Sequence, residues 1–150
     1  MITYNRFQGD PALKITVDGA DMTFKGGQPV MDQGFNNAAL ISLFTRRGWW
    51  GNALFQDVNQ QIGSDFEEPR TIINVQTIND YTDAARGALR WMKESGVASK
   101  IDVTVTNPNM QQIRTAVVIY PPGQDIRSLL FLKNGINWIS QTLNPAHGRL

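Results

Sequence analysis

The sequence predicts an α+β fold in which one main amphipathic helix packs on a small antiparallel sheet, with a short β element at the N-terminus. Apolar residues recur at helical spacing over 77–95, three strand-like runs follow between residues 100 and 132, and turn sequences divide the first thirty residues. The chain has 150 residues and 41% apolar content, which suits one domain. We expect a single domain, 1–150, with a hairpin-like extension over 1–30 and a core over 31–150.

The N-terminal β element rests on a short alternating run. Residues 13–17 alternate apolar and polar side chains, and residues 22–24 are the expected partner strand across Asp18-Gly19. The following segment, 35–47, is compatible with a short helix or a strand, and we favour the helix.

The main helix is the clearest element. Thr77 or Asn79 is suited to cap its start, and Gly96 marks its end after Ser95. At 100° per residue, one arc holds Ile78, Tyr81, Ala85, Ala88, Leu89 and Met92. This apolar arc predicts that the helix covers a core. Gly87 lies on the polar side, where glycine costs about 1 kcal/mol relative to alanine unless a neighbour packs closely.

Three strands are expected after the helix, over 100–106, 113–120 and 127–132, as an antiparallel meander. The sequence Asn107-Pro108-Asn109 predicts the first turn. Within the third run, residues 128–132 contain no charge or proline, the usual protection of a free sheet edge. We therefore predict that this strand, with Leu130 at its centre, is a docking edge.

Composition excludes several classes of function. The net charge of +1 gives no electrostatic field that would attract nucleic acid. The longest apolar run, 116–119, is far shorter than a membrane span. The chain has no cysteine and one histidine, His147, close to the C-terminus. We therefore expect no catalytic residues, no metal site, no cofactor, no nucleic-acid partner and no membrane partner.

A cationic and aromatic motif occupies residues 46–51. Arg46 and Arg47 precede Trp49 and Trp50, with glycines on both sides of the tryptophan pair. Tryptophan and arginine are enriched at interface hot spots, but aromatic faces also form cores or stack on bases and sugars. A protein interface, a buried core and a nucleic-acid or glycan site all remain open.

An acidic segment lies before the main helix. Asp65, Glu67 and Glu68 are too close in sequence to suggest the two separated carboxylates of a glycosidase, and we expect solvated or ion-paired loop acids. Glu68, Pro69 and Arg70 form a further interface candidate, because the arginine could bind a carboxylate on a partner. Local geometry at the helix entry is the alternative.

Two motifs taken together resemble a known family. The first motif is residues 42–51, Ser-Leu-Phe-Thr-Arg-Arg-Gly-Trp-Trp-Gly. The second is residues 88–92, Ala-Leu-Arg-Trp-Met, followed by Gly96-Val97-Ala98. Together they resemble the small Mu-type baseplate protein of contractile-tailed phages. The resemblance extends from about Asp32 to the end of the meander. That family is similar to sheath initiators and is related to a wedge protein with a lysozyme-like label. In the related wedge protein family a Glu-Pro-Arg tripeptide follows the main helix. In this chain the same tripeptide, residues 68–70, precedes the predicted main helix.

The resemblance implies a structural virion protein of a tail baseplate rather than an enzyme. Its expected partners are baseplate wedge proteins and the tail sheath protein, with tube or hub proteins as further candidates. The protein would be assembled in the host cytoplasm and would stand in several copies in a ring, joining the baseplate to the first sheath ring by strand addition at a sheet edge. A peptidoglycan hydrolase and a glycan or single-strand nucleic-acid binder are the competing hypotheses.

Overall fold

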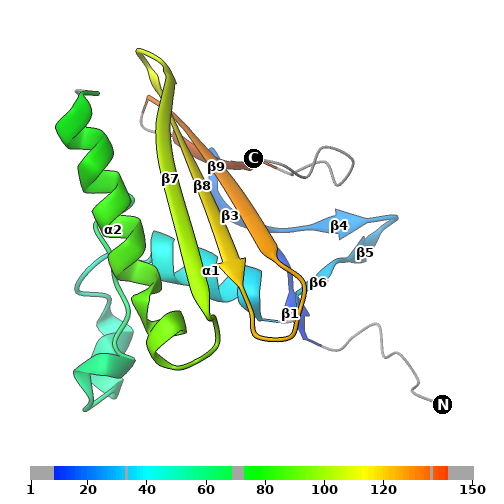
Figure 1. Ribbon diagram of the computed structural model, residues 1–150. Coiled ribbons are helices and arrows are strands. Elements are labelled where there is room, and N and C mark those ends of the chain that lie inside the picture. The colour runs from blue at the N-terminus through cyan, green and yellow to red at the C-terminus, as the bar shows by residue number, and fades with distance from the viewer. Residues whose placement is uncertain (1–8, 33, 69–72, 136, 142–150) are drawn as a thin grey trace.

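The computed structural model describes residues 9–32, 34–68, 73–135 and 137–141. The elements of the described chain, in order, are β1 (Asp10–Pro11), β2 (Leu13–Thr16), β3 (Gly19–Met22), β4 (Phe24–Lys25), β5 (Gln28–Pro29), β6 (Met31–Asp32), α1 (Phe35–Phe44), the 3-10 turns η1 (Trp50–Leu54) and η2 (Val58–Gln60), α2 (Val75–Glu94), β7 (Lys100–Asn109), β8 (Gln112–Tyr120), β9 (Arg127–Asn134) and β10 (Asn137–Gln141). The predicted α+β class is confirmed. Figure 1 shows α2 along one face of the C-terminal strands, and the small N-terminal strands to their other side.

The N-terminal element consists of three two-stranded pairings, β1 with β6, β2 with β3, and β4 with β5. The partner of the first predicted strand is β3, which shares only Met22 with the expected run 22–24. Gly19, with a φ of +117°, helps close the turn immediately after Asp18, so that Leu13 pairs with Met22. Phe24 consequently belongs to the next hairpin, β4–β5.

The segment expected as a short helix forms α1. The Asp32 carboxylate accepts hydrogen bonds from the backbone N–H groups of Gly34 (3.0 Å) and Asn37 (2.9 Å), which satisfies donors at the helix start. The buried Asn37 side chain then bonds backbone groups of Pro11 and Leu13, both at 2.9 Å. These bonds connect α1 to the N-terminal strands.

The main helix, α2, begins earlier than either predicted cap. Asn74 is its N-cap, because its side-chain Oδ1 accepts the Thr77 N–H at 2.9 Å. Thr77 and Asn79 therefore lie inside the helix. The predicted end is confirmed, since the helix stops at Glu94 and Gly96 adopts a φ of +77°.

The C-terminal sheet has the strand order β10-β9-β8-β7, with every pairing antiparallel. Residues 107–109 do not end the first strand. Pairing shifts after Thr106 and resumes at Asn109 opposite Gln112, so the turn lies at residues 110–111. The fourth strand, β10, was not predicted, although Asn134-Gly135 is a strong hairpin-turn sequence.

The core lies between the sheet and the two helices. The predicted helical arc supplies Tyr81, Ala85, Leu89 and Met92, each fully buried. Aromatic rings from α1, the loop before α2, α2, β9 and β10 meet edge-on or tilted around Phe66; they belong to Phe44, Phe66, Tyr81, Phe131 and Trp138. The helices are also joined by a hydrogen bond of 2.9 Å from Trp91 Nε1 to Ser42 Oγ.

Leu130 does not lie on a sheet edge, and the prediction of a docking edge at β9 is wrong. Leu130 pairs with Ala116 of β8 on one side and with Gln141 of β10 on the other. The absence of charge over residues 128–132 is explained by their central position, because an internal strand needs no protection from foreign strands.

Candidate interaction site

The aromatic motif lies in a closed loop, which we call the tryptophan loop (residues 46–63). Its two ends meet where the Ser64 N–H donates to the Thr45 carbonyl at 2.8 Å. Gly63 permits this approach: its φ is +144°, and a Cβ there would come within 3.0 Å of the Arg46 carbonyl oxygen. The loop therefore leaves the fold and returns at one point. Figure 1 shows this segment beside the lower end of α2, away from the sheet.

A side-chain clamp holds the interior of the loop. Asn52 Nδ2 donates to the Ile62 carbonyl at 2.6 Å, and Asn52 Oδ1 accepts the Ile62 N–H at 2.9 Å. This pair of bonds imitates a strand pairing across ten residues. The loop is fixed by hydrogen bonds rather than by burial of its own apolar side chains.

The two tryptophans of the loop have different environments. A Cβ at Gly51 would overlap the ring of Trp49, so this ring lies directly on the Gly51 backbone. Trp50 lies against Trp49 with ring centroids 5.5 Å apart, and it is 76% exposed, compared with 37% for Trp49. The buried-core interpretation of this pair is therefore wrong. Trp49 supports the loop, and Trp50 projects from it.

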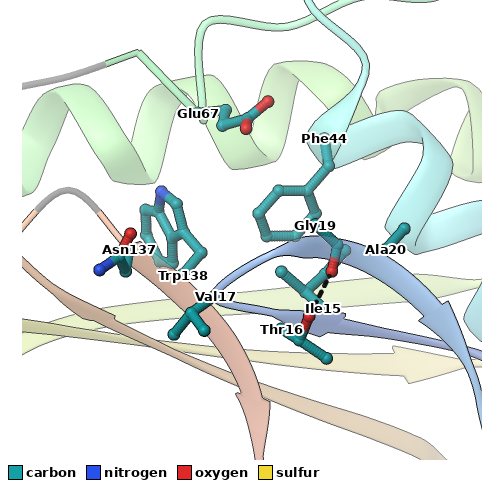
Figure 2. A pocket seen from close by; sticks show the side chains of 9 residues that line it. All are labelled: Ile15, Thr16, Val17, Gly19, Ala20, Phe44, Glu67, Asn137 and Trp138. Carbon is teal, nitrogen blue, oxygen red and sulfur yellow. Dashed lines mark hydrogen bonds between the residues drawn. The ribbon is translucent and has the colours of Figure 1, made fainter.

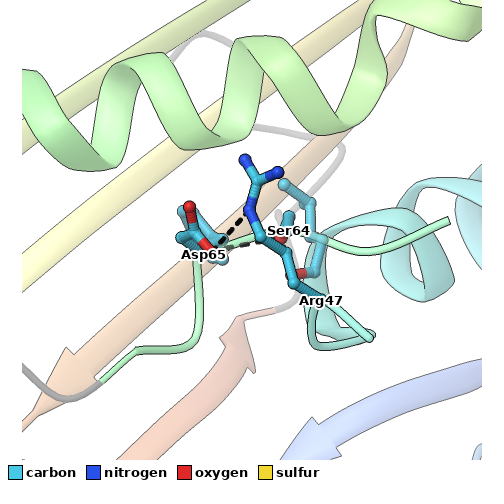
Figure 3. A network of polar contacts seen from close by, with 5 residues as sticks. Arg47, Ser64 and Asp65 are labelled. Carbon is cyan, nitrogen blue, oxygen red and sulfur yellow. Dashed lines mark hydrogen bonds and ion pairs between the residues drawn. The ribbon is translucent and has the colours of Figure 1, made fainter. Parts of the chain in front are cut away.

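Both arginines of the motif bind acids of the following segment. Arg47 Nε lies 2.6 Å from Asp65 Oδ1, as Figure 3 shows, and Arg46 Nε lies 3.6 Å from Glu67 Oε2. Phe66, between the two acids, is fully buried in the aromatic cluster. The expectation of ion-paired loop acids is confirmed for Asp65 and Glu67. Because the arginine side chains are largely exposed, each pair contributes at most about 1 kcal/mol to stability.

The Glu-Pro-Arg candidate is described only at its first residue. Glu68 is exposed, and its N–H donates to the Asp65 carbonyl at 3.2 Å. Pro69 and Arg70 lie outside the described residues, as does His147. Their suggested roles remain predictions.

The two outer strands of the sheet differ in how their edges are covered. The outer side of β10 faces the N-terminal element, where the Ile15 N–H donates to Ser140 Oγ at 2.7 Å. No strand of the described chain pairs with the outer edge of β7. Lys100 and Asp102 form an ion pair of 3.1 Å at its start, and this neighbouring carboxylate raises the pKa of the Lys100 ammonium. Within the described residues, β7 is therefore an outer strand whose free side no other strand pairs with, although α2 packs against it.

Sequence reasoning missed two structurally important residues, one in the core and one in the tryptophan loop. Lys133 is buried on β9, with Nζ 5.6 Å from the centre of the Tyr81 ring. It was missed because β9 continues past the predicted strand end at residue 132. Gly51 was noted only as a glycine beside the tryptophan pair, whereas its backbone is the surface on which the Trp49 ring lies. Two large aromatics followed directly by glycine were the available signal.

The described residues contain no group of three or more histidine, cysteine, aspartate or glutamate side chains placed to hold a metal ion. Among them, no helix combines the length and apolar character that crossing a membrane requires.

Together these features define a small α+β protein that has an exposed aromatic loop and, in the part of the chain that the structure describes, an outer strand of the main sheet that no other strand pairs with. The chain belongs to the family described as phage protein GP46, which matches residues 32–125. It is also similar to the Mu-like prophage FluMu protein gp46 of Haemophilus influenzae, with 28% identity over 111 residues, which cover 70% of this chain and 82% of that protein. No solved structure matches the chain with comparable significance. The predicted resemblance to a Mu-type phage protein is confirmed.

Proposed function

We propose that this phage protein is a structural component of a contractile tail baseplate and acts as its sheath initiator. The observation that carries the proposal is the open outer edge of β7 in a member of a Mu-type phage family. A row of unpaired backbone donors and acceptors is a template for a strand from another chain. A sheath subunit that adds a strand at this edge would continue the antiparallel sheet.

The usable part of the edge is short. The ion pair of Lys100 with Asp102 lies at one end, and Pro108 and the pairing shift after Thr106 lie at the other. These features discourage pairing at the ends of β7. They leave roughly residues 102–106 for a partner strand, which is the length of an ordinary strand.

In this proposal the protein has no catalytic activity and binds no cofactor, metal, nucleic acid or membrane. Baseplate wedge proteins hold it from one side, the tail sheath protein docks on β7, and tube or hub proteins are further neighbours. Several copies form a ring in the virion. The protein joins this ring after synthesis in the host cytoplasm.

Electron cryo-microscopy of extended tails tests the proposal. The expected result is a ring of copies between wedge and sheath, with a sheath strand beside residues 102–106. Tails that lack the protein should carry a baseplate and tube without an ordered sheath. The proposal fails if the protein is absent from mature tails, or if sheath subunits attach while the β7 edge faces solvent.

A further inference from the structure

The tryptophan loop presents an apolar surface that nothing in the described chain covers. Trp50 and Leu54 are each 76% exposed, and Val58 is 71% exposed. Between Gly48 and Gly63 the sequence contains a single charged residue, Asp57, and the remaining polar residues are neutral amides. The surface of the tryptophan loop is therefore suited to an uncharged, apolar binding site on a protein.

The loop is also ready to bind without further ordering. The Asn52 clamp, the close approach at Gly63 and the Trp49 ring on Gly51 fix its backbone. A fixed loop loses little conformational freedom when it docks, so more of its apolar contact contributes to affinity. Trp50 is the natural anchor, because it combines the largest exposed apolar area with a single N–H donor.

A cavity with a mixed polar and apolar lining lies on the same chain. It has a volume of about 200 Å³, and its walls come from the β2–β3 hairpin, the end of α1, the acidic loop and the start of β10; the lining residues are Ile15, Thr16, Val17, Gly19, Ala20, Phe44, Glu67, Asn137 and Trp138. In Figure 2, Glu67, Phe44 and Trp138 surround the space above the β2–β3 turn. The volume exceeds the roughly 150 Å³ of an enclosed apolar cavity that binds benzene, and this cavity is partly open to solvent.

The cavity offers what an indole side chain needs. Ile15, Phe44 and Trp138 supply apolar walls, and the Glu67 carboxylate supplies an acceptor for an indole N–H. Glu67 also lies 3.6 Å from Arg46 at the base of the tryptophan loop, which fixes the cavity close to that loop. Because the net charge is only +1, electrostatic repulsion between two copies of the chain is weak.

We propose that Trp50 of one copy inserts into this cavity of a second copy, with its indole N–H donating to Glu67. The contact is made by the isolated chain and does not require the sheath-initiating role. Reciprocal insertion gives a closed dimer, and insertion in one direction gives a ring or an open chain. In a baseplate, the same contact would link neighbouring copies.

Sedimentation equilibrium of the purified chain tests this contact. Trp50→Ala removes the side chain that inserts, and Val17→Asp places a charge at the cavity, where Val17 is 60% exposed. Either change should weaken self-association at least roughly 30-fold, as expected for loss of an interface hot spot. Met110→Ala is the matched control, because Met110 is exposed at the tip of the β7–β8 hairpin and should leave association unchanged. Melting curves establish that each variant is folded.

A mixture of the two weakened variants gives the decisive result. Trp50→Ala retains the cavity and Val17→Asp retains the tryptophan, so mixing them should restore one contact and yield a mixed dimer. Three outcomes overturn the proposal: no self-association of the wild type up to millimolar concentration, self-association of Val17→Asp at wild-type strength, or no mixed dimer. Sheath initiation is tested separately in whole tails, so failure here leaves that proposal standing.

Discussion

The ring of Trp49 lies on the backbone of Gly51, in the space that a Cβ of any other residue at position 51 would fill. This contact keeps Trp49 half-buried and directs Trp50 outward. Position 51 therefore controls the shape of the tryptophan loop.

Replacing Gly51 with alanine should displace the Trp49 ring and lower the free energy of unfolding by about 1–3 kcal/mol, as overpacking commonly does. Thermal melting followed by tryptophan fluorescence measures both effects. Gly87→Ala is the matched control: nothing lies within 4 Å of an added Cβ there, and the residue is inside α2. This variant should gain about 0.5–1 kcal/mol. A Gly51→Ala protein as stable as wild type would contradict the assignment of Trp49 as a support.

The two tryptophans should differ when each is replaced by alanine. Trp50→Ala should change the free energy of unfolding by no more than about 0.5 kcal/mol, because the side chain is mostly exposed. Trp49→Ala should cost roughly 1–2 kcal/mol, since part of its ring is buried against the loop. Urea denaturation of each variant checks the order. Unfolding of both at room temperature would show that the pair belongs to the core.

Asn74 should account for the start of α2. Asn74→Ala removes the acceptor of the Thr77 N–H and should cost about 1 kcal/mol. Asn79→Ala changes the same residue type inside the helix, where it caps nothing, and should be neutral or slightly stabilising. Chemical denaturation monitored by circular dichroism compares the two. Equal losses would mean that the helix begins elsewhere.

Proline at position 130 should unfold the protein rather than block one docking edge. Leu130 belongs to a strand paired on both sides, so proline there disrupts the sheet interior and should cost about 3 kcal/mol or more. Leu130→Val keeps the backbone donor and serves as the control. A folded Leu130→Pro protein with a normal melting temperature would contradict the strand order.

The purified protein should not degrade peptidoglycan. General acid–base catalysis is worth about 100- to 10,000-fold in rate, so a hydrolase that used Glu67 or Glu68 would lose measurable activity on replacement of either by alanine. The assay is release of soluble fragments from purified cell wall, with a known hydrolase as the positive control. Turnover by the wild type that disappears in Glu67→Ala or Glu68→Ala would favour the hydrolase and overturn the structural assignment.

The sequence by itself determined the elements whose signal is local. The apolar arc of α2 has the helical period, the runs around Val103 and Val117 have strand character, and Gly96 supplies the left-handed stop. The sequence also predicted that Asp65 and Glu67 are solvated or ion-paired loop acids, but their partners Arg47 and Arg46 lie much earlier in the chain and are brought to them only by the fold.

The tertiary structure decided what depends on neighbours distant in sequence. The position of β9 in the sheet could not be read from residues 127–132, because an unprotected edge and a central strand share one composition and differ only in whether β10 pairs beside them. The same holds for Trp49 and Trp50, which are adjacent in sequence. One lies on Gly51 and the other faces solvent, and this difference arises from the backbone path that Asn52 and Gly63 impose on the loop. Local periodicity fixes which segments become helix or strand, whereas exposure depends on the packing of the whole chain.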